Sequence, residues 1–373
     1  MTFTLSSTAL SSRLQALARV LNSKNTLAIL DSFLFEIADK SLTITASDGE
    51  NVVISKLELI DSNENFSFCV SSKTIIDAVK EFAEEPLTFE INLDEMSATM
   101  TYHNGQNKLP IQVSESYPKL PMPDGDVHVI TLEANKFEKA ISRSIFATAQ
   151  DDLRPVMNGL YIDLKSDNLT IVASDGHKLV RNENYDITGN EPAAFILPKK
   201  PATLLKSLLP KDGNVEIKFT QSNAVISFEN YVLTCRLIEG RYPNYNSVIP
   251  QNNPNEVTVS RQSLLGALKR VLVFASQSSY LIRFSLEHNK LTLSSEDLDY
   301  STSAKEELVC EYYGQTMSIG FKGTSMIEIL GNLDCDDIVL KLADPSRAGV
   351  VIPADKEDKD TVLMLLMPML LND

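Results

Sequence analysis

The sequence lacks several features that mark whole classes of protein. Its 373 residues contain no tryptophan, four cysteines and four histidines. The cysteines stand far apart without a Cys-x-x-Cys pair, so we expect neither a disulfide framework nor a cysteine and histidine zinc site. The longest apolar run, Val362 to Leu371, has ten residues, whereas a membrane-spanning helix needs about 20. These absences predict a protein with no metal and no contact with a membrane.

A secretory signal is also missing from the expected position. The first ten residues, MTFTLSSTAL, do not place a basic region before an apolar one. Apolar residues make up 43% of the chain and charged residues 23%, as in folded globular proteins. The length corresponds to two to four domains at roughly 100 to 200 residues each. We therefore expect a cytoplasmic protein whose thiols are reduced and mostly buried.

Three blocks of sequence recur in the same order along the chain. The first block reads FTLSSTALSSRLQALARVL, ITLEANKFEKAISRSIFAT and VTVSRQSLLGALKRVLVFA, and its copies begin 127 residues apart. The second block reads LTITASDGE, LTIVASDGH and LTLSSEDLD. The third block aligns Lys73, Lys200 and Lys322. This order predicts three tandem copies of one domain, over residues 1–125, 126–253 and 254–373.

Each copy combines helical and strand-like patterns. In the first block, leucines recur every three or four residues, as on one face of a helix, and residues that favour helix N-termini come before them. The leucines are Leu10, Leu14, Leu17 and Leu21, and the candidate caps are Ser6, Ser7 and Thr8. A second helix is predicted from Ile75, Ile76, Val79 and Phe82. Intervening segments such as FLFEIADKSLTITAS alternate apolar and polar residues, as half-buried strands do. We predict an α+β fold, with two helices on antiparallel sheets in each copy.

Charge is segregated between the predicted helices and the rest of the chain. The chain holds 34 basic and 50 acidic residues, and its net charge of −16 repels nucleic acid on average. The predicted helix segments nevertheless sum to +6, which leaves −22 elsewhere. They span residues 6–24, 71–85, 133–154, 198–213, 260–282 and 321–334. Because no helix-turn-helix, zinc finger or row of aromatic residues accompanies them, we expect sequence-independent contact with phosphates.

No enzyme motif is present. The sequence contains no GxGxxG, GxxxxGK[ST], GxSxG, HExxH or EF-hand pattern. The tripeptides Ser47-Asp48-Gly49 and Ser174-Asp175-Gly176 are predicted to be tight turns, because a structural repeat explains two copies better than chemistry does. The acidic pairs at residues 84–85 and 151–152 are expected to be solvated. The sequence therefore predicts a protein that is not an enzyme and needs no cofactor.

Three segments carry a resemblance to a known family. LTIVASDGHKL (Leu169 to Leu179), LIEGRYPNYNSVIP (Leu237 to Pro250) and the C-terminal MPM (Met367 to Met369), together with the threefold repeat, resemble the bacterial DNA polymerase III beta subunit, the sliding clamp. The resemblance spans essentially the whole chain. It implies that two chains join head to tail into a six-domain ring whose twelve helices face duplex DNA. It also implies partners: the replicative polymerase, an ATP-driven clamp loader and repair proteins, which bind through short linear peptides.

The resemblance assigns residues to three sites. DNA contacts map to Lys24, Lys73, Arg154, Lys199 and Lys200. An apolar pocket for the partner peptide maps to Arg154, Met157, Ser174, Gly176, His177, Leu179, Pro243, Val248, Leu365, Met367, Pro368 and Met369. The dimer interface maps to Ala78, Leu109 and Ile111 of the first domain and to Val273, Phe274, Glu306 and Glu307 of the third.

The sequence departs from the family's pattern at two pocket positions and at its end. Ser247 stands where some members carry arginine, and Leu370 stands where a basic residue is common. The tail also extends to Asp373. These departures affect the peptide preference that we expect of the pocket.

Two other functions compete with the clamp on the sequence alone. The first is a repeat-built scaffold for protein interactions that uses the same pocket and never encircles DNA. The second is a hydrolase that uses one of the acidic pairs. Charge segregation favours the clamp over the scaffold, and the missing motifs disfavour the hydrolase.

Overall fold

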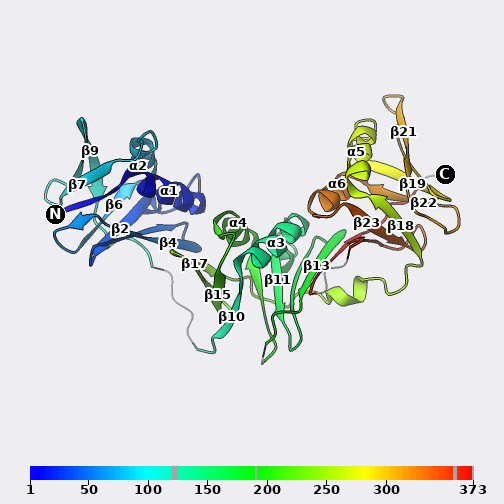
Figure 1. The fold of residues 1–373 in the computed structure, drawn as a ribbon, viewed down its shortest axis with the longest axis horizontal. Coiled ribbons are helices and arrows are strands. Elements are labelled where there is room, and N and C mark those ends of the chain that lie inside the picture. The colour runs from blue at the N-terminus through cyan, green and yellow to red at the C-terminus, as the bar shows by residue number, and fades with distance from the viewer. Residues whose placement is uncertain (120–124, 190, 356–358, 372–373) are drawn as a thin grey trace. The chain divides into compact units, whose positions relative to one another are not determined.

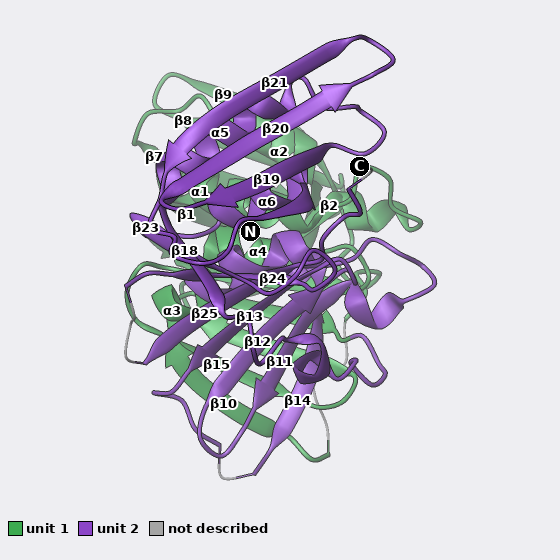
Figure 2. Ribbon diagram, turned by 90° about the vertical axis from the view of Figure 1, so that its right-hand side faces the viewer, with its two compact units in different colours: residues 1–138, 203–237 green, residues 139–202, 238–373 purple. Residues whose placement is uncertain are grey.

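The computed structural model describes residues 1–119, 125–189, 191–355 and 359–371. These residues form helices and antiparallel strands, so the predicted α+β class is confirmed (Figure 1). They divide into two compact units (Figure 2). Unit 1 comprises residues 1–138 and 203–237, and unit 2 comprises residues 139–202 and 238–373. All three unit boundaries fall inside the second repeat, and the three domain ranges given above stay a prediction.

The first repeat lies wholly in unit 1. Its helices are α1 (Ser7–Leu17) and α2 (Ser72–Val79). Its strands are β1 (Thr2–Ser6), β2 (Ser32–Ala38), β3 (Ser41–Ser47), β4 (Asn51–Glu58), β5 (Asp61–Ser62), β6 (Phe66–Ser71), β7 (Pro86–Asn92), β8 (Ser97–Tyr102) and β9 (Gly105–Gln112). Each helix follows directly on a strand, because a serine at the strand end caps it: Ser6 Oγ accepts the Ala9 amide at 3.1 Å.

The helices of this repeat are shorter than their sequence patterns predict. Leu10, Leu14 and Leu17 are fully buried, as the helical period requires. Leu21 lies beyond the end of α1, because the chain tightens into a 3-10 turn at Ala18–Val20. Phe82 likewise lies beyond the end of α2.

The second repeat is shared between the two units. Its helices are α3 (Ala134–Ser144) and α4 (Lys199–Leu208). Its strands are β10 (His128–Glu133), β11 (Gly159–Leu164), β12 (Leu169–Ser174), β13 (Lys178–Asn184), β14 (Ala193–Pro198), β15 (Asn214–Phe219), β16 (Asn223–Phe228) and β17 (Tyr231–Arg236). In unit 1 its last strand, β17, pairs antiparallel with β4 of the first repeat. One sheet therefore runs through unit 1 in the order β10-β15-β16-β17-β4-β3-β2-β6-β9-β8-β7-β1-β5.

The third repeat lies in unit 2. Its helices are α5 (Arg261–Leu272) and α6 (Gly323–Gly331). Its strands are β18 (Asn255–Ser260), β19 (Leu281–Glu287), β20 (Lys290–Asp297), β21 (Thr302–Val309), β22 (Met317–Lys322), β23 (Asp337–Leu342), β24 (Gly349–Pro353) and β25 (Asp360–Leu366). Its last strand, β25, pairs antiparallel with β13, from Lys178 opposite Leu366 to Asn184 opposite Asp360. The two sheets of this unit run β14-β11-β12-β13-β25-β24-β23-β18 and β21-β20-β19-β22.

Positive charge is concentrated on the helices. From α1 to α6 the helices carry +1, 0, +2, +3, +3 and −1, or +8 together. The chain as a whole carries −16, so −24 lies outside them. The segregation inferred from the sequence is therefore sharper once the helix ends are known, because the acidic residues at 84–85 and 151–152 lie outside the helices.

The acidic pairs reach solvent, as the sequence predicted, since Glu84 and Asp152 are exposed and Glu85 and Asp151 are half-buried, but three of them also accept hydrogen bonds. Glu84 accepts hydrogen bonds from the side chains of Ser6 and Thr8, and these bonds lower the pKa of its carboxyl. Glu85 Oε2 accepts the His103 amide at 3.0 Å. Asp151 is bound by Arg154, as described below. Three of these four carboxylates therefore hold local structure.

All four cysteines are free thiols. Cys69, Cys235 and Cys310 are buried, as predicted, whereas Cys335 is half-buried. Burial raises the pKa of the Cys69 and Cys235 thiols to about 12, so both stay protonated at neutral pH.

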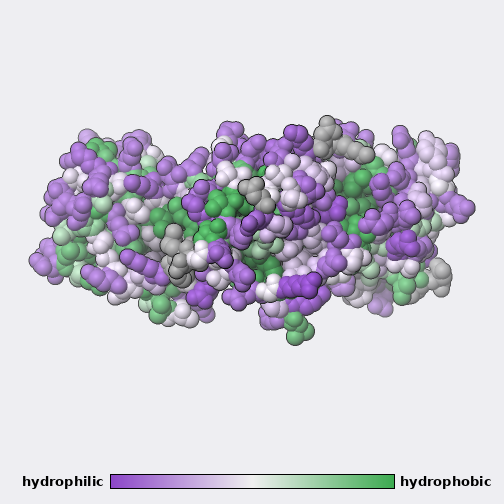
Figure 3. Space-filling model, turned by 90° about the horizontal axis from the view of Figure 1, so that it is seen from below, coloured by the Kyte–Doolittle hydropathy of each residue, from purple (hydrophilic) through white to green (hydrophobic). Residues whose placement is uncertain are grey.

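Within the described ranges no helix is long and apolar enough to span a membrane. On the face drawn in Figure 3 hydrophilic side chains predominate, and hydrophobic ones gather in small patches.

Candidate functional site

The repeated Ser-Asp-Gly segment forms the same turn in both copies, as predicted. In the second copy the Asp175 Oδ1 atom accepts the amides of His177 at 2.8 Å and Lys178 at 2.9 Å. Gly176 donates its amide to Ser174 Oγ at 3.1 Å and has a φ of +90°, which favours glycine. The turn thereby presents Gly176 and His177 at the surface of unit 2, between β12 and β13.

The structure adds a third copy of this turn that the tripeptide did not reveal. Asp297 Oδ1 accepts the amides of Asp299 at 3.0 Å and Tyr300 at 3.3 Å. Leu298 stands where the other copies have glycine. The aspartate therefore defines the turn in all three repeats, and the block alignment at Leu291 was the available signal for it.

Arg154 lies directly over this turn. Its Nε atom donates to Asp151 Oδ2 at 2.9 Å, and about half of its side chain is exposed. A Cβ atom added to Gly176 would lie 2.7 Å from the Arg154 Nη1 atom. Gly176 thus has two roles: it adopts the left-handed backbone conformation of the turn, and its missing side chain leaves room for the Arg154 guanidinium.

Replacing Gly176 with alanine is expected to lower the free energy of unfolding by about 1 to 2 kcal/mol, because an L side chain is strained at this φ. The matched control is Gly49→Ala, with a φ of +94° in the same turn of the first repeat, where the nearest atom to the new Cβ is Leu30 Cδ1 at 3.8 Å. Urea denaturation of both variants should give similar losses. A negligible loss for Gly176→Ala would mean that the turn adopts another conformation.

Apolar residues of four segments pack beneath the turn. Leu179 of β13 and Leu365 of β25 face each other across the strand pair and belong to one buried cluster. Tyr242 and Tyr245 join this cluster from the loop that carries Pro243 and Val248. Met157, at the end of the 3-10 turn after Arg154, is also buried. Two large apolar side chains remain open to solvent here, Val248 at 55% exposure and Met367 at 42%.

The C-terminal segment forms backbone hydrogen bonds both with the turn and with β22. The Met367 amide donates to the His177 carbonyl oxygen at 2.8 Å, and the Met369 amide donates to the Gly320 carbonyl oxygen at 2.8 Å. Pro368, which has no amide to donate, lies between them and is half-buried. The residues assigned above to the peptide pocket all lie in unit 2, and we call them the peptide-site residues. Of the departures, Ser247 and Leu370 are exposed, and residues 372–373 lie outside the described residues.

The residues assigned to DNA contact belong to both units. Lys24 and Lys73 are exposed in unit 1, Lys24 after the end of α1 and Lys73 in α2. Lys199 and Lys200 begin α4 in unit 2 and are half-buried.

Sequence reasoning missed a polar groove of about 490 Å³ beside α1, lined by Ser11, Ser12, Gln15, Arg19, Lys80 and Tyr231 among others. Its hydroxyl, amide and cationic groups are of the kind that contacts phosphates, and the acid-free face of α1 was the available signal.

The residues assigned to the dimer interface differ in exposure. Val273 and Phe274, just after α5, are 77% and 41% exposed. Leu109 and Ile111 of β9 are buried within the first repeat, so they offer a partner little side-chain surface. Glu306 of β21 accepts a hydrogen bond from Arg270 Nε at 3.0 Å within the same chain.

Three family models together match most of the chain. The N-terminal domain of the DNA polymerase III beta subunit matches residues 1–121, the central domain matches residues 131–244, and the C-terminal domain matches residues 246–369. The chain belongs to the DNA polymerase III beta subunit family.

Relatives of this family align over nearly the full length of the chain. The beta sliding clamp of Pseudomonas aeruginosa is 26% identical over 366 residues, which cover 98% of this chain and 99% of the relative. That of Haemophilus influenzae is 26% identical over 365 residues, with the same coverage. A crystal structure of the Pseudomonas aeruginosa clamp bound to griselimycin matches with a TM-score of 0.94 at 25% identity over 100% of both chains. The resemblance stated from the sequence motifs is confirmed.

Proposed function

We propose that this chain is a DNA sliding clamp whose two copies close into a ring around duplex DNA. The observation that carries the proposal is a repeated strand joint. The last strand of the second repeat, β17, pairs with β4, and the last strand of the third repeat, β25, pairs with the equivalent strand β13. By the same rule the last strand of the first repeat, β9, would pair with β21.

In the part of the chain that the structure describes, β9 and β21 form no such joint. Among the described strands β21 pairs only with β20, and β9 pairs with β8 and, over two residues, with β6. An unpaired strand edge is a template for another chain. Pairing of β9 with β21 of a second copy would form two further joints and close six repeats into a ring.

A ring of this kind holds DNA by topology and needs no active site. The +8 charge of the helices supports phosphate contacts that are screened within about 8 Å and let the clamp slide. Lys24, Lys73, Arg154, Lys199 and Lys200 contribute to that contact. The clamp tethers the replicative polymerase in the cytoplasm, and partners that carry a linear peptide bind at the peptide-site residues. The matches above favour this function over an interaction scaffold that never encircles DNA.

The decisive experiment measures retention on DNA. Clamp loaded by its cognate loader and ATP is expected to stay on nicked circular DNA through gel filtration and to leave within minutes once the circle is linearised. A variant with Lys24, Lys73, Lys199 and Lys200 changed to glutamate should load poorly, because each reversal adds repulsion from phosphates. Equal retention on circular and linear DNA would contradict encirclement.

A further inference from the structure

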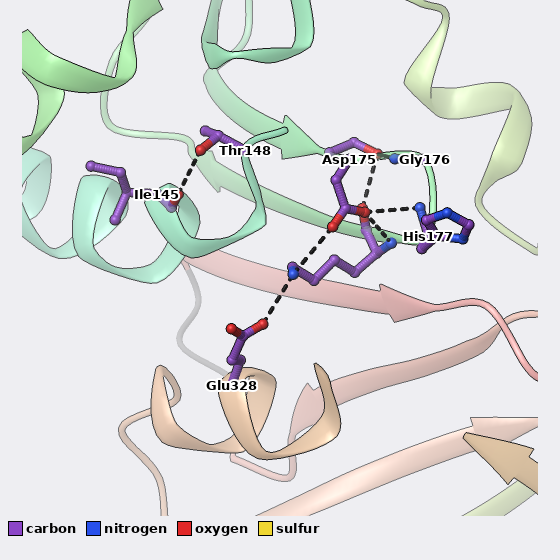
Figure 4. Close-up of polar contacts among 8 residues, drawn as sticks. Ile145, Thr148, Asp175, Gly176, His177 and Glu328 are labelled. Atoms are coloured by element: carbon purple, nitrogen blue, oxygen red, sulfur yellow. Dashed lines mark hydrogen bonds and ion pairs between the residues drawn. The ribbon is translucent and has the colours of Figure 1, made fainter. Parts of the chain in front are cut away.

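Lys178 joins the candidate peptide site to a helix of the next repeat. Its Nζ atom lies 3.1 Å from Asp175 Oδ2 and 3.0 Å from Glu328 Oε2 (Figure 4). Asp175 belongs to the turn that presents Gly176 and His177, whereas Glu328 belongs to α6. The Lys178 side chain is 11% exposed, so this ion pair is much less screened by solvent than the surface pairs of the chain.

The contacts of Lys178 keep it charged. Burial lowers the pKa of its ammonium, but the hydrogen bond from Lys178 to Glu328 and the charge of Asp175 outweigh burial and raise that pKa. Burial raises the pKa of the Asp175 carboxyl, but the amides of Lys178 and His177 outweigh it and lower that pKa. Lys178 and Asp175 are therefore both ionised at neutral pH.

The other repeats place different residues at this position. In the first repeat Asn51 donates its Nδ2 to Asp48 Oδ2 at 2.9 Å, so the contact stays within the turn. In the third repeat the position is Tyr300, which is 78% exposed. The turn forms in these two repeats without a lysine. Folding of the turn therefore does not explain why a lysine occupies position 178.

Lys178 also closes a circuit of contacts around the peptide-site residues. Starting from the turn, the His177 carbonyl binds the Met367 amide, and the Met369 amide binds the Gly320 carbonyl of β22. β22 ends at Lys322 and α6 begins at the next residue. Glu328 of α6 then pairs with Lys178, which brings the path of contacts back to the turn. The Lys178–Glu328 pair is the one link of this circuit that depends on two side chains.

We propose that Lys178 is a positioning residue that fixes the Ser174–Lys178 turn against α6 and thereby sets the affinity of the peptide-site residues for partner peptides. This inference rests on the proposed function, because it needs the peptide to bind at those residues. Lys178 acts through Gly176 and His177, which it places relative to the C-terminal segment. The third repeat thus influences a surface that is built partly on the second.

The test measures binding of a labelled synthetic peptide that carries the clamp-binding motif of the cognate polymerase. Lys178→Met and Glu328→Gln are each expected to raise the dissociation constant by about three- to tenfold, since each removes a charge-assisted hydrogen bond. The double variant should be no weaker than the single variants, and Lys178→Arg should bind nearly as wild type. The control is Lys359→Met, which removes the ion pair to Asp186 at 2.8 Å beside the same two strands and should leave binding unchanged.

The outcomes separate this inference from the proposed function. If the wild type binds the peptide and neither Lys178→Met nor Glu328→Gln weakens binding, Lys178 is not a positioning residue. Lower melting temperatures with unchanged dissociation constants would assign it a purely structural role and would also overturn the inference. Failure of the wild type itself to bind would refute the peptide site. Glu328 is about half exposed, so Glu328→Gln should fold even if Lys178→Met does not.

Discussion

Changing Phe274 to aspartate is expected to turn the dimer into monomers. Phe274 and Val273 follow α5, and their apolar side chains are exposed to solvent. In the ring they would lie beside the β9 and β21 edges, and a carboxylate buried there without a counter-charge would weaken dimerisation by a factor of about 100 or more.

Light scattering at micromolar concentration measures this directly. The wild type should show twice the 41.3 kDa of one chain, and Phe274→Asp should show 41.3 kDa. Ile60→Asp is the control, because Ile60 is also a large exposed apolar residue, at 62% exposure, and was not assigned to the interface. An undiminished mass for Phe274→Asp would place the joint elsewhere, and a monomeric wild type would remove the ring from the proposal.

The second large effect is expected at the peptide-site residues. Val248 and Met367 are the two exposed apolar side chains above the buried cluster of Leu179 and Leu365. The double change Val248→Asp and Met367→Asp should weaken peptide binding by about 100-fold, because an apolar peptide side chain would desolvate two carboxylates. Since both side chains are largely exposed, the fold should survive.

Fluorescence anisotropy with the labelled peptide measures the loss, and the dimer mass checks folding. The control is Leu27→Asp, since Leu27 matches Val248 in exposure, at 54%, but lies in unit 1. Binding within threefold of wild type for the double variant would show that partner peptides bind at another surface. An equal loss for Leu27→Asp would point to a general effect of added negative charge.

Helix ends were the part of the fold that sequence patterns located least well. The period of Leu10, Leu14 and Leu17 identified α1 because burial of one face selects apolar residues every three or four positions. The same period continues to Leu21, although the helix has already ended at Leu17. Periodicity reports which side chains face the core, and it does not register where backbone hydrogen bonding changes to a 3-10 turn.

The sequence alone determined the threefold repeat, the α+β class, the capped amphipathic helices and the family, because burial periods, turn residues and recurring blocks are local properties that survive in the order of residues. The tertiary structure alone decided which strands join the repeats, that β9 and β21 lack such a joint, and that Glu328 reaches Lys178 across 150 positions. Pairings of this kind depend on the register of distant strands and the direction of side chains in space, and no local pattern encodes them.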